Sequence, residues 1–334
     1  MPPISRRFLL RAAALGLTTT ALGGCLGTGG GTTGSVAAVA EEPTILVATT
    51  RRPTPSGARP WFSGERGRGL AFARARLAGS GGSLVGRIAG AVGGEWSVAE
   101  VEAPVVERAA EAFAAAALGR DVLLYVHGYR ETFETAAASA VDLSRGIAFR
   151  GATGLFAWPS GGSTFDYAYD RESALWSRDG LEELLLALAG SPSGGRVHVV
   201  AHSMGSFLTL ETLRLLRASG GEAAMARIGS VTLASPDVDI DQFVGAVERL
   251  GPDARKITVI SSVNDRALEL SRRLAGGVAR AGAAEREKLA RLETLGVRVA
   301  DASEFASGLI NHDLFLTNPD VKAVVRRAIE RSGA

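Results

Sequence analysis

The fold of this chain follows from one run of residues, Val197-His198-Val199-Val200-Ala201-His202-Ser203-Met204-Gly205. An apolar run that is typical of a buried strand leads directly into a serine, and a helical pattern begins at once. This arrangement matches the nucleophile-elbow pattern G-x-S-x-G, with Ala201 in place of the first glycine. Small residues are needed two positions before and after the serine, because larger groups would clash with the neighbouring strand or helix. The pattern therefore predicts a strained Ser203 whose Oγ projects above a sheet.

Short apolar runs alternate with helical patterns on both sides of this elbow. We expect strands at 44–49, 70–77, 96–101, 122–126, 154–158, 197–201, 228–234, 257–262 and 297–300. Helical patterns occupy 131–147, 171–189, 204–217, 239–250 and 267–294, and a final helix begins at Asn318-Pro319. Apolar strands between helices indicate an α/β fold with a mostly parallel central sheet and helices on both faces. In such sheets, active residues lie at the carboxyl ends of the strands.

A serine needs a general base before it becomes a good nucleophile. The chain has four histidines. His198 lies inside a strand, and His202 adjoins Ser203 and is expected to point away from its Oγ. His127 follows an early strand. The chain order of serine, acid and histidine in folds with this elbow leaves His312 as the base, since it comes after the last strand.

The acid of such a site orients the imidazole and stabilises its charged form. It should lie at the end of a strand that precedes the histidine. Asp265 follows the strand at 257–262 and is the preferred residue. Asp237 follows the strand at 228–234 and is the alternative, because a carboxylate there could also reach a late histidine.

The oxyanion that forms during acyl transfer needs preorganised N–H donors. The backbone amide of Met204, at the start of the helix behind the serine, is the first candidate. The loop after the 122–126 strand reads His127-Gly128-Tyr129-Arg130, and the amide of Tyr129 is the second candidate. Trp158, at another strand end, is either a pocket wall or a core residue.

The N-terminal segment has a different character. Arg6 and Arg7 followed by an apolar run resemble a twin-arginine export signal, and residues 1–24 are expected to form a signal peptide. The sequence Leu22-Gly23-Gly24-Cys25 resembles a lipobox, so we expect a lipid on Cys25. The alternative is an ordinary signal peptide with a chance cysteine. Residues 25–43 have the composition of a flexible linker, which leaves 44–334 as the folded domain. These features predict an exported bacterial lipoprotein of the cell envelope.

Composition excludes several classes of protein. The chain has 334 residues, 46% of them hydrophobic, and a formal net charge of +2. The hydrophobic content excludes a disordered chain, and no basic face suggests nucleic acid. A single cysteine excludes an internal disulfide and a cysteine-rich metal site. The glycines at 79–82 lack the strand–helix context of a phosphate loop, so the sequence predicts no cofactor and no metal.

Several blocks together resemble the bacterial α/β-hydrolase family catalogued as domain of unknown function 900. Asn311 and Arg130 stand where this family typically has Gly and Asn. The matching blocks run from about residue 44 to 320 and are Leu46-Val47-Ala48-Thr49-Thr50-Arg51, Phe62-Ser63-Gly64-Glu65-Arg66-Gly67, Val126-His127-Gly128-Tyr129, Phe156-Ala157-Trp158-Pro159-Ser160, Asp170-Arg171-Glu172-Ser173, Ala201-His202-Ser203-Met204-Gly205, Leu233-Ala234-Ser235-Pro236-Asp237, Asn264-Asp265-Arg266-Ala267-Leu268 and Asn311-His312. The resemblance implies an esterase- or lipase-like α/β-hydrolase fold.

The expected function is hydrolysis of carboxylic esters through an acyl-enzyme on Ser203, with His312 and Asp265 completing a triad. Two alternatives use the same sequence features. The same three residues could transfer an acyl group to another acceptor or cleave a thioester. A catalytically silent envelope protein could instead use the fold for binding or scaffolding, because a fold alone does not fix function.

Overall fold

The computed structural model describes residues 42–55, 59–79, 95–163, 166–192, 194–262, 265–274, 278–283, 286–305 and 312–333. The predicted signal peptide, Cys25, nearly all of the predicted linker and Asn311 lie outside the described residues. The chain from Glu42 onward forms one compact unit, which contains every element discussed below.

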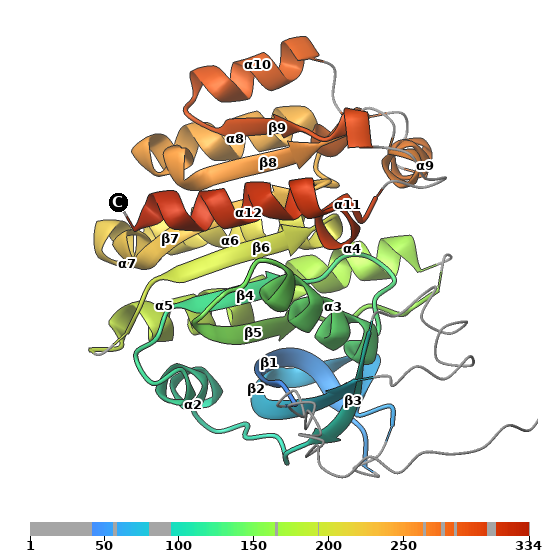
Figure 1. Cartoon of the computed structure of the whole chain (residues 1–334), viewed down its shortest axis with the longest axis vertical. Coiled ribbons are helices and arrows are strands. Elements are labelled where there is room, and N and C mark those ends of the chain that lie inside the picture. The colour runs from blue at the N-terminus through green and yellow to red at the C-terminus, as the bar shows by residue number, and fades with distance from the viewer. Residues whose placement is uncertain are drawn as a thin grey trace, which may run out of the picture. The chain divides into compact units, whose positions relative to one another are not determined.

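The described part of this unit is built on a nine-stranded sheet with the spatial order β3-β2-β1-β5-β4-β6-β7-β8-β9 (Figure 1). The strands are β1 (Thr44–Pro53), β2 (Phe62–Gly79), β3 (Trp96–Val101), β4 (Val122–Val126), β5 (Ala152–Ala157), β6 (Val197–His202), β7 (Ile228–Ala234), β8 (Ile257–Ser261) and β9 (Arg298–Asp301). β2 runs antiparallel to β1 and β3, and the remaining neighbours pair in parallel. The predicted mostly parallel sheet is confirmed.

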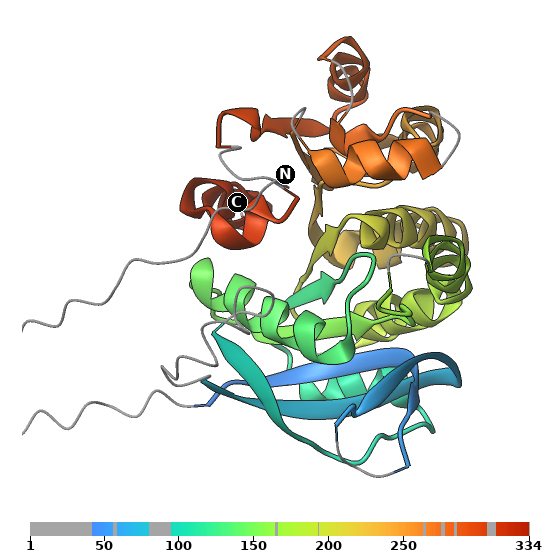
Figure 2. The ribbon, with the colours of Figure 1, turned by 90° about the vertical axis from the view of Figure 1, so that its right-hand side faces the viewer.

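Helices cover both faces of the sheet, as the edge-on view shows (Figure 2). They are α2 (Ala109–Ala116), α3 (Phe133–Gly146), α4 (Tyr167–Trp176), α5 (Arg178–Gly190), α6 (Met204–Ser219), α7 (Gly221–Arg227), α8 (Ile240–Leu250), α9 (Arg266–Leu274), α10 (Arg286–Thr294), α11 (Leu314–Thr317) and α12 (Pro319–Ser332), with 3₁₀ turns η1 (Gly251–Lys256), η2 (Ala281–Ala283) and η3 (Ser303–Phe305). The core is split by the sheet. In β4, Leu124 packs with α2, α5, α6 and α8, whereas Tyr125 packs with α3, α11 and α12. Burial on both sides explains why this strand is wholly apolar.

The winding of the chain places the site. From β4 the chain crosses to β5 on one side and then to β6 on the other side of β4. The carboxyl ends of β4 and β6 therefore flank the point at which the winding reverses, and open α/β sheets bind ligands there. His127 follows β4 at this edge, and Ser203 follows β6.

The predicted helix at 171–189 is divided in the structure, and the helical segments predicted within 267–294 are two helices. The segment 171–189 forms α4 and α5, which meet at Ser177, whose Oγ donates to the carbonyl of Ser173 at 2.8 Å and lies 2.8 Å from the hydroxyl of Thr50. The segment 267–294 forms α9 and α10, separated by η2. The small residues of η2 bind the loop after β7, since the amide of Gly282 donates to the carbonyl of Pro236 at 3.0 Å.

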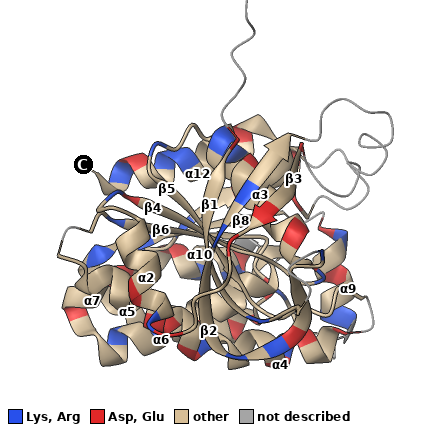
Figure 3. Cartoon of the chain, turned by 90° about the horizontal axis from the view of Figure 1, so that it is seen from below, with Lys and Arg blue, Asp and Glu red and all other residues tan. Residues whose placement is uncertain are grey.

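The start of the last helix follows the predicted signal. Asn318 caps α12, and its side chain accepts from the amides of Asp320 and Val321, with Pro319 in the first turn. Basic and acidic residues are interspersed around the unit (Figure 3). Among the described residues, no helix has both the length and the apolar character needed to cross a bilayer.

Candidate active site

Ser203 forms a sharp turn between β6 and α6. Its φ of 51° and ψ of −119° lie in a region that side-chain-bearing residues rarely adopt. The backbone holds it there: the amide of Ser203 donates to the carbonyl of Ala234 at 2.9 Å, and its carbonyl accepts from the amide of Ser206 at 2.9 Å. The side chain is nearly buried. This geometry is that of the predicted elbow, and it stores backbone strain at the serine.

Two glycines make room for the turn. A Cβ at Gly205 would lie 2.3 Å from the carbonyl oxygen of His127 and 2.6 Å from that of Val126. A Cβ at Gly128 would lie 2.8 Å from Nδ1 of His202 and 3.1 Å from Cβ of Ser203. The loop after β4 and the elbow after β6 therefore approach each other more closely than any side chain allows. Ala201 is fully buried within β6.

His312 and Asp265 lie together. Nδ1 of His312 is 2.7 Å from Oδ2 of Asp265, and the side chain of Asp265 is fully buried. The other oxygen of Asp265 accepts from the amides of Ala267 and Leu268 at 3.0 and 3.1 Å, which fixes the carboxylate at the start of α9. Burial lowers the pKa of His312, but the hydrogen bond and charge of Asp265 outweigh it and raise the pKa above the ordinary histidine value.

His202 joins the elbow to the histidine. Its Nε2 lies 3.0 Å from the backbone carbonyl oxygen of His312, so Nε2 carries the proton and donates. The rings of His202 and His312 are 4.6 Å apart. Burial and the nearby His312 hold the pKa of His202 well below its usual value. His202 is thus a neutral support for the position of His312, and it contacts the main chain of that residue.

Asp237, the alternative acid, lies in a different buried network. Its carboxylate is 3.0 Å from Nε of Arg280, and it accepts from the hydroxyls of Ser271 at 2.6 Å and Tyr167 at 3.1 Å. Both Asp237 and Arg280 are nearly inaccessible to solvent. The carboxylate is therefore already satisfied by groups other than the imidazole of His312.

The loop after β4 presents the predicted donor. Within the described residues, the backbone amides of Tyr129 and Met204 donate to no other protein group, and the amides of a first helical turn are free by geometry. The side chain of Tyr129 is held by its hydroxyl, which donates to the carbonyl of Ser163 at 3.2 Å. Arg130 has a φ of 65°, a conformation that asparagine and glycine adopt more readily.

Two buried charged residues, Arg51 and Asp170, hold this loop. Arg51, at the end of β1 and only 2% exposed, donates from Nη2 to the carbonyl of Glu131 at 2.6 Å. Burial lowers the pKa of Arg51 to about 10, against the opposing charge of Asp170. Asp170 accepts from the amide of Gly161 at 2.7 Å and from that of Arg130 at 3.3 Å. Arg51 and Asp170 thus connect the loops that follow β4 and β5.

His127 completes this support. Its ring stacks on Trp158 at 4.7 Å between centroids, and the indole N–H of Trp158 donates to the carbonyl of His127 at 2.8 Å. Nε2 of His127 lies 3.4 Å from the guanidinium of Arg51. Burial, followed by the charge of Arg51, lowers the pKa of His127 to about 3. Trp158 is fully buried, so it is a core residue rather than a pocket wall.

Sequence reasoning gave no role to Arg51, because an arginine at the end of a strand is usually exposed. The available signal was its position directly behind the apolar run of β1, whose buried face continues to this residue. His198, predicted to be buried inside its strand, is 2% exposed, and its Nδ1 lies 3.0 Å from the hydroxyl of Ser230.

Comparison with known proteins gives two kinds of similarity. The family described as alpha/beta hydrolase of unknown function (DUF900) matches residues 108–329. An uncharacterized protein of Nostoc, alr1448, is 37% identical over 70 residues. That match covers 21% of this chain and spans only 17% of the length of the Nostoc protein.

Solved structures of hydrolases are similar to this chain at low sequence identity. Est1E from Butyrivibrio proteoclasticus is 9% identical with a TM-score of 0.40, and the match covers 78% of this chain and 94% of that one. The naproxen esterase of Bacillus subtilis is 9% identical with a TM-score of 0.39, and the match covers 88% and 93% of the two chains.

Proposed function

This chain belongs to the family of alpha/beta hydrolases of unknown function (DUF900), and we propose that it hydrolyses carboxylic esters with Ser203 as nucleophile. The observation that carries the proposal is the pair His312–Asp265, 2.7 Å apart, in which the main chain of His312 is bound by His202, the residue that precedes the strained Ser203. A strained serine and a carboxylate-oriented imidazole are the two groups that acyl transfer requires.

The proposed reaction has two halves. With Nδ1–H of His312 donating to Asp265, Nε2 carries the lone pair and accepts the proton of Ser203 Oγ as this oxygen attacks the ester carbonyl carbon. The carbonyl oxygen becomes an oxyanion that accepts from the amides of Met204 and Tyr129. As the intermediate collapses, the alcohol leaves and takes the proton from His312, and the acyl group stays on Ser203.

Water completes the cycle. His312 accepts a proton from the water molecule as its oxygen attacks the acyl carbon. The second tetrahedral intermediate then expels Ser203, which regains the proton, and the carboxylic acid is released. His312 therefore acts once as base and once as acid in each half.

We assign the acid role to Asp265 rather than to Asp237. The carboxylate of Asp265 reaches the imidazole directly, whereas that of Asp237 is bound by a guanidinium and two hydroxyls. Removing Asp237 would leave Arg280 as an unpaired buried charge, which is destabilising whatever the chemistry.

We also propose that the mature chain is anchored in the cell envelope by a lipid on Cys25, after export directed by residues 1–24. The proposal rests on the lipobox-like Leu22-Gly23-Gly24-Cys25 and the paired arginines before it. Labelling of bacteria that express the chain with a fatty-acid probe should mark the wild type and not Cys25→Ser. An equal label on both would contradict it.

The hydrolase proposal is tested on the full-length chain with a fluorophosphonate probe and with chromogenic esters of graded acyl length. We expect covalent labelling and turnover in the wild type and loss of both in Ser203→Ala. Ser219→Ala, which changes an exposed serine at the end of α6, is the matched control and should behave as the wild type. A folded wild type that is neither labelled nor active would refute the proposal and favour the binding or scaffold role.

A further inference from the structure

The pairing of β1 and β2 contains a long bulge. Thr49 pairs with Ala71, and the next pair is Arg51 with Arg66, so Thr50 alone faces residues 67–70. A Cβ at Gly67 would lie 2.9 Å from the carbonyl oxygen of Arg51, whereas a Cβ at Gly69 would meet no atom within 4 Å. The bulge is therefore in close contact with β1 at Gly67 and leaves open space beside Gly69.

A pocket of about 600 Å³ lies at this bulge. Its charged lining consists of Arg51, Arg52, Arg66 and Arg68. The other lining residues are glycine, proline, alanine and valine, so no carboxylate among the described residues lines the pocket. Four arginines in the lining of one concavity give it a positive potential that favours an anion.

The four arginines differ in whether their guanidinium groups already have partners within the protein. Arg52 forms an ion pair with Glu65. Arg66 donates from Nε to the hydroxyl of Ser173 at 3.1 Å and stacks over the rings of Tyr169 and Trp176, which fixes its guanidinium without neutralising it.

The remaining two arginines differ in whether a ligand could reach them. Arg51 is 2% exposed, and its terminal nitrogens donate to the carbonyls of Ser63, Ser160 and Glu131, so it contributes charge rather than free donors. Arg68 is exposed on the bulge and forms no ion pair with any described residue. Arg68 therefore offers a charged guanidinium that no carboxylate among the described residues neutralises.

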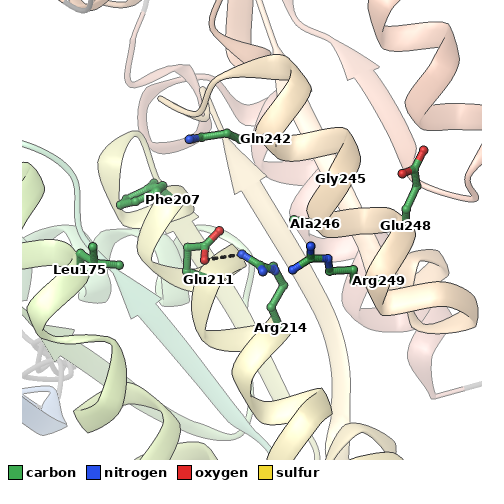
Figure 4. Close-up of a pocket in the computed structure, with 9 residues that line it drawn as sticks. All are labelled: Leu175, Phe207, Glu211, Arg214, Gln242, Gly245, Ala246, Glu248 and Arg249. Atoms are coloured by element: carbon green, nitrogen blue, oxygen red, sulfur yellow. Dashed lines mark hydrogen bonds and ion pairs between the residues drawn. The ribbon is translucent and has the colours of Figure 1, made fainter.

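A second pocket on this protein has both arginines and carboxylates in its lining. It has a volume of about 580 Å³ and lies among α4, α6 and α8 (Figure 4). There Arg214 pairs with Glu211 at 2.6 Å, and Glu248 lies in the same lining as Arg249. Its charges are of both signs, in contrast to the pocket at the bulge.

We propose that the pocket at the β1–β2 bulge binds a phosphate group carried by an organic molecule. Guanidinium groups match the oxygens of a phosphate in pairs, and a phosphate offers several strong acceptor oxygens to Arg66 and Arg68 at once. The volume exceeds what inorganic phosphate needs, which leaves space for the attached group. This proposal is independent of the chemistry at Ser203, because binding can be measured without turnover.

The test is calorimetric titration of the full-length chain with inorganic phosphate and with glycerol 3-phosphate at constant ionic strength. We expect one saturable site, which glycerol 3-phosphate fills more tightly. Arg68→Gln should weaken binding roughly tenfold, and Arg66→Gln with Arg68→Gln should weaken it further. The double change Arg326→Gln with Arg331→Gln removes the same charge from α12 and should leave binding intact.

The source of the phosphate is distinguished by sedimentation with vesicles, using Cys25→Ser so that no lipid is attached to the chain. Stronger binding to phosphatidylglycerol than to phosphatidylcholine vesicles, lost in the Arg66/Arg68 double variant, supports a lipid headgroup. Binding of glycerol 3-phosphate without such a preference supports a soluble organic phosphate. Equal binding of the probes by wild type and double variant, or no saturable binding to the folded wild type, overturns the proposal.

Discussion

The imidazole Nε2 of His202 lies 3.0 Å from the backbone carbonyl oxygen of His312, and their two rings are 4.6 Å apart. The residue that precedes Ser203 therefore holds the main chain of the histidine that we propose as its base. Phe315 packs on the same imidazole of His202, with 4.9 Å between ring centroids. One side chain thus joins two loops that are 110 residues apart in the chain.

Replacing His202 by Phe should keep the packing and remove the hydrogen bond. We expect kcat to fall roughly 2- to 10-fold, as one lost hydrogen bond displaces His312, with little change in KM. Steady-state kinetics on a chromogenic ester would measure this. Ser230→Ala removes the partner of His198 at the other end of β6 and serves as control. Similar losses in both variants would mean that the effect is not specific to the His312 contact.

The pH dependence should report His312. Since only neutral His312 accepts a proton, kcat/KM should fall on the acid side with an apparent pKa above about 6.5, the ordinary histidine value. In Asp265→Asn the raising influence is removed while burial remains, so the acid limb should move to lower pH and kcat should fall by roughly 10⁴. Loss of activity in Asp237→Asn with full activity in Asp265→Asn would reverse the assignment of the acid.

Stability should decline in acid because of His127. Its folded-state pKa is lowered to about 3, against about 6.5 in an unfolded chain, so the folded state binds fewer protons between these values. The stabilisation is complete above pH 6.5 and is lost as the pH falls toward 3, at about 1.4 kcal/mol per pH unit. Urea unfolding between pH 7 and 4 measures the slope. His127→Gln should reduce this slope by the contribution of one proton, and an unchanged slope would contradict the prediction.

Asp170, which supports the loops after β4 and β5, should be important for stability. Asp170→Asn weakens the acceptor of two backbone amides and removes the largest of the negative charges that act on Arg51, and we expect the free energy of unfolding to fall by about 1–3 kcal/mol. Asp179→Asn, an exposed carboxylate at the start of α5, should change it by less than about 0.5 kcal/mol. Chemical unfolding of both variants tests the difference. A loss in Asp170→Asn no larger than that in Asp179→Asn would mean that Asp170 does not hold these loops.

Two glycine substitutions should have opposite effects. Gly205→Ala places a Cβ 2.3 Å from a backbone oxygen that cannot move away, so we expect at least about 3 kcal/mol of destabilisation and loss of fluorophosphonate labelling. Gly245→Ala, inside α8, meets no atom within 4 Å and should stabilise the protein by about 0.5–1 kcal/mol. Thermal unfolding of the two variants makes the comparison. Equal stability would contradict the close approach described here.

Patterns along the chain were sufficient for much of this architecture. The parallel strands could be predicted because their residues are buried on both faces, as in β4 and β8, whose observed bounds lie within one residue of the expected ones. Chain order led to His312 and Asp265, which lie within hydrogen-bonding distance, although their catalytic roles remain predictions. The helix start at Pro319 was also readable, because a capping asparagine precedes it.

Other features depend on contacts between distant segments. Between α9 and α10, the amide of Gly282 donates to the carbonyl of Pro236, and no local pattern indicates this contact. The support of the loop after β4 by Arg51 requires β1 to lie beside β5, a pairing that the sequence pattern does not specify. The bulge at residues 67–70 arises from the register of two antiparallel strands.

The close approach of Gly128 and Gly205 has a consequence for redesign. Neither glycine has room for a side chain, because its Cβ would meet the other loop. The Cβ at Gly128 would point at His202, and the Cβ at Gly205 would point at the carbonyl of His127. A chimaera that transplants residues 201–206 into another hydrolase scaffold would inherit a clash unless residues 126–130 travelled with them. Laboratory evolution of this protein should accordingly find changes in the two segments together, as linked pairs, rather than one at a time.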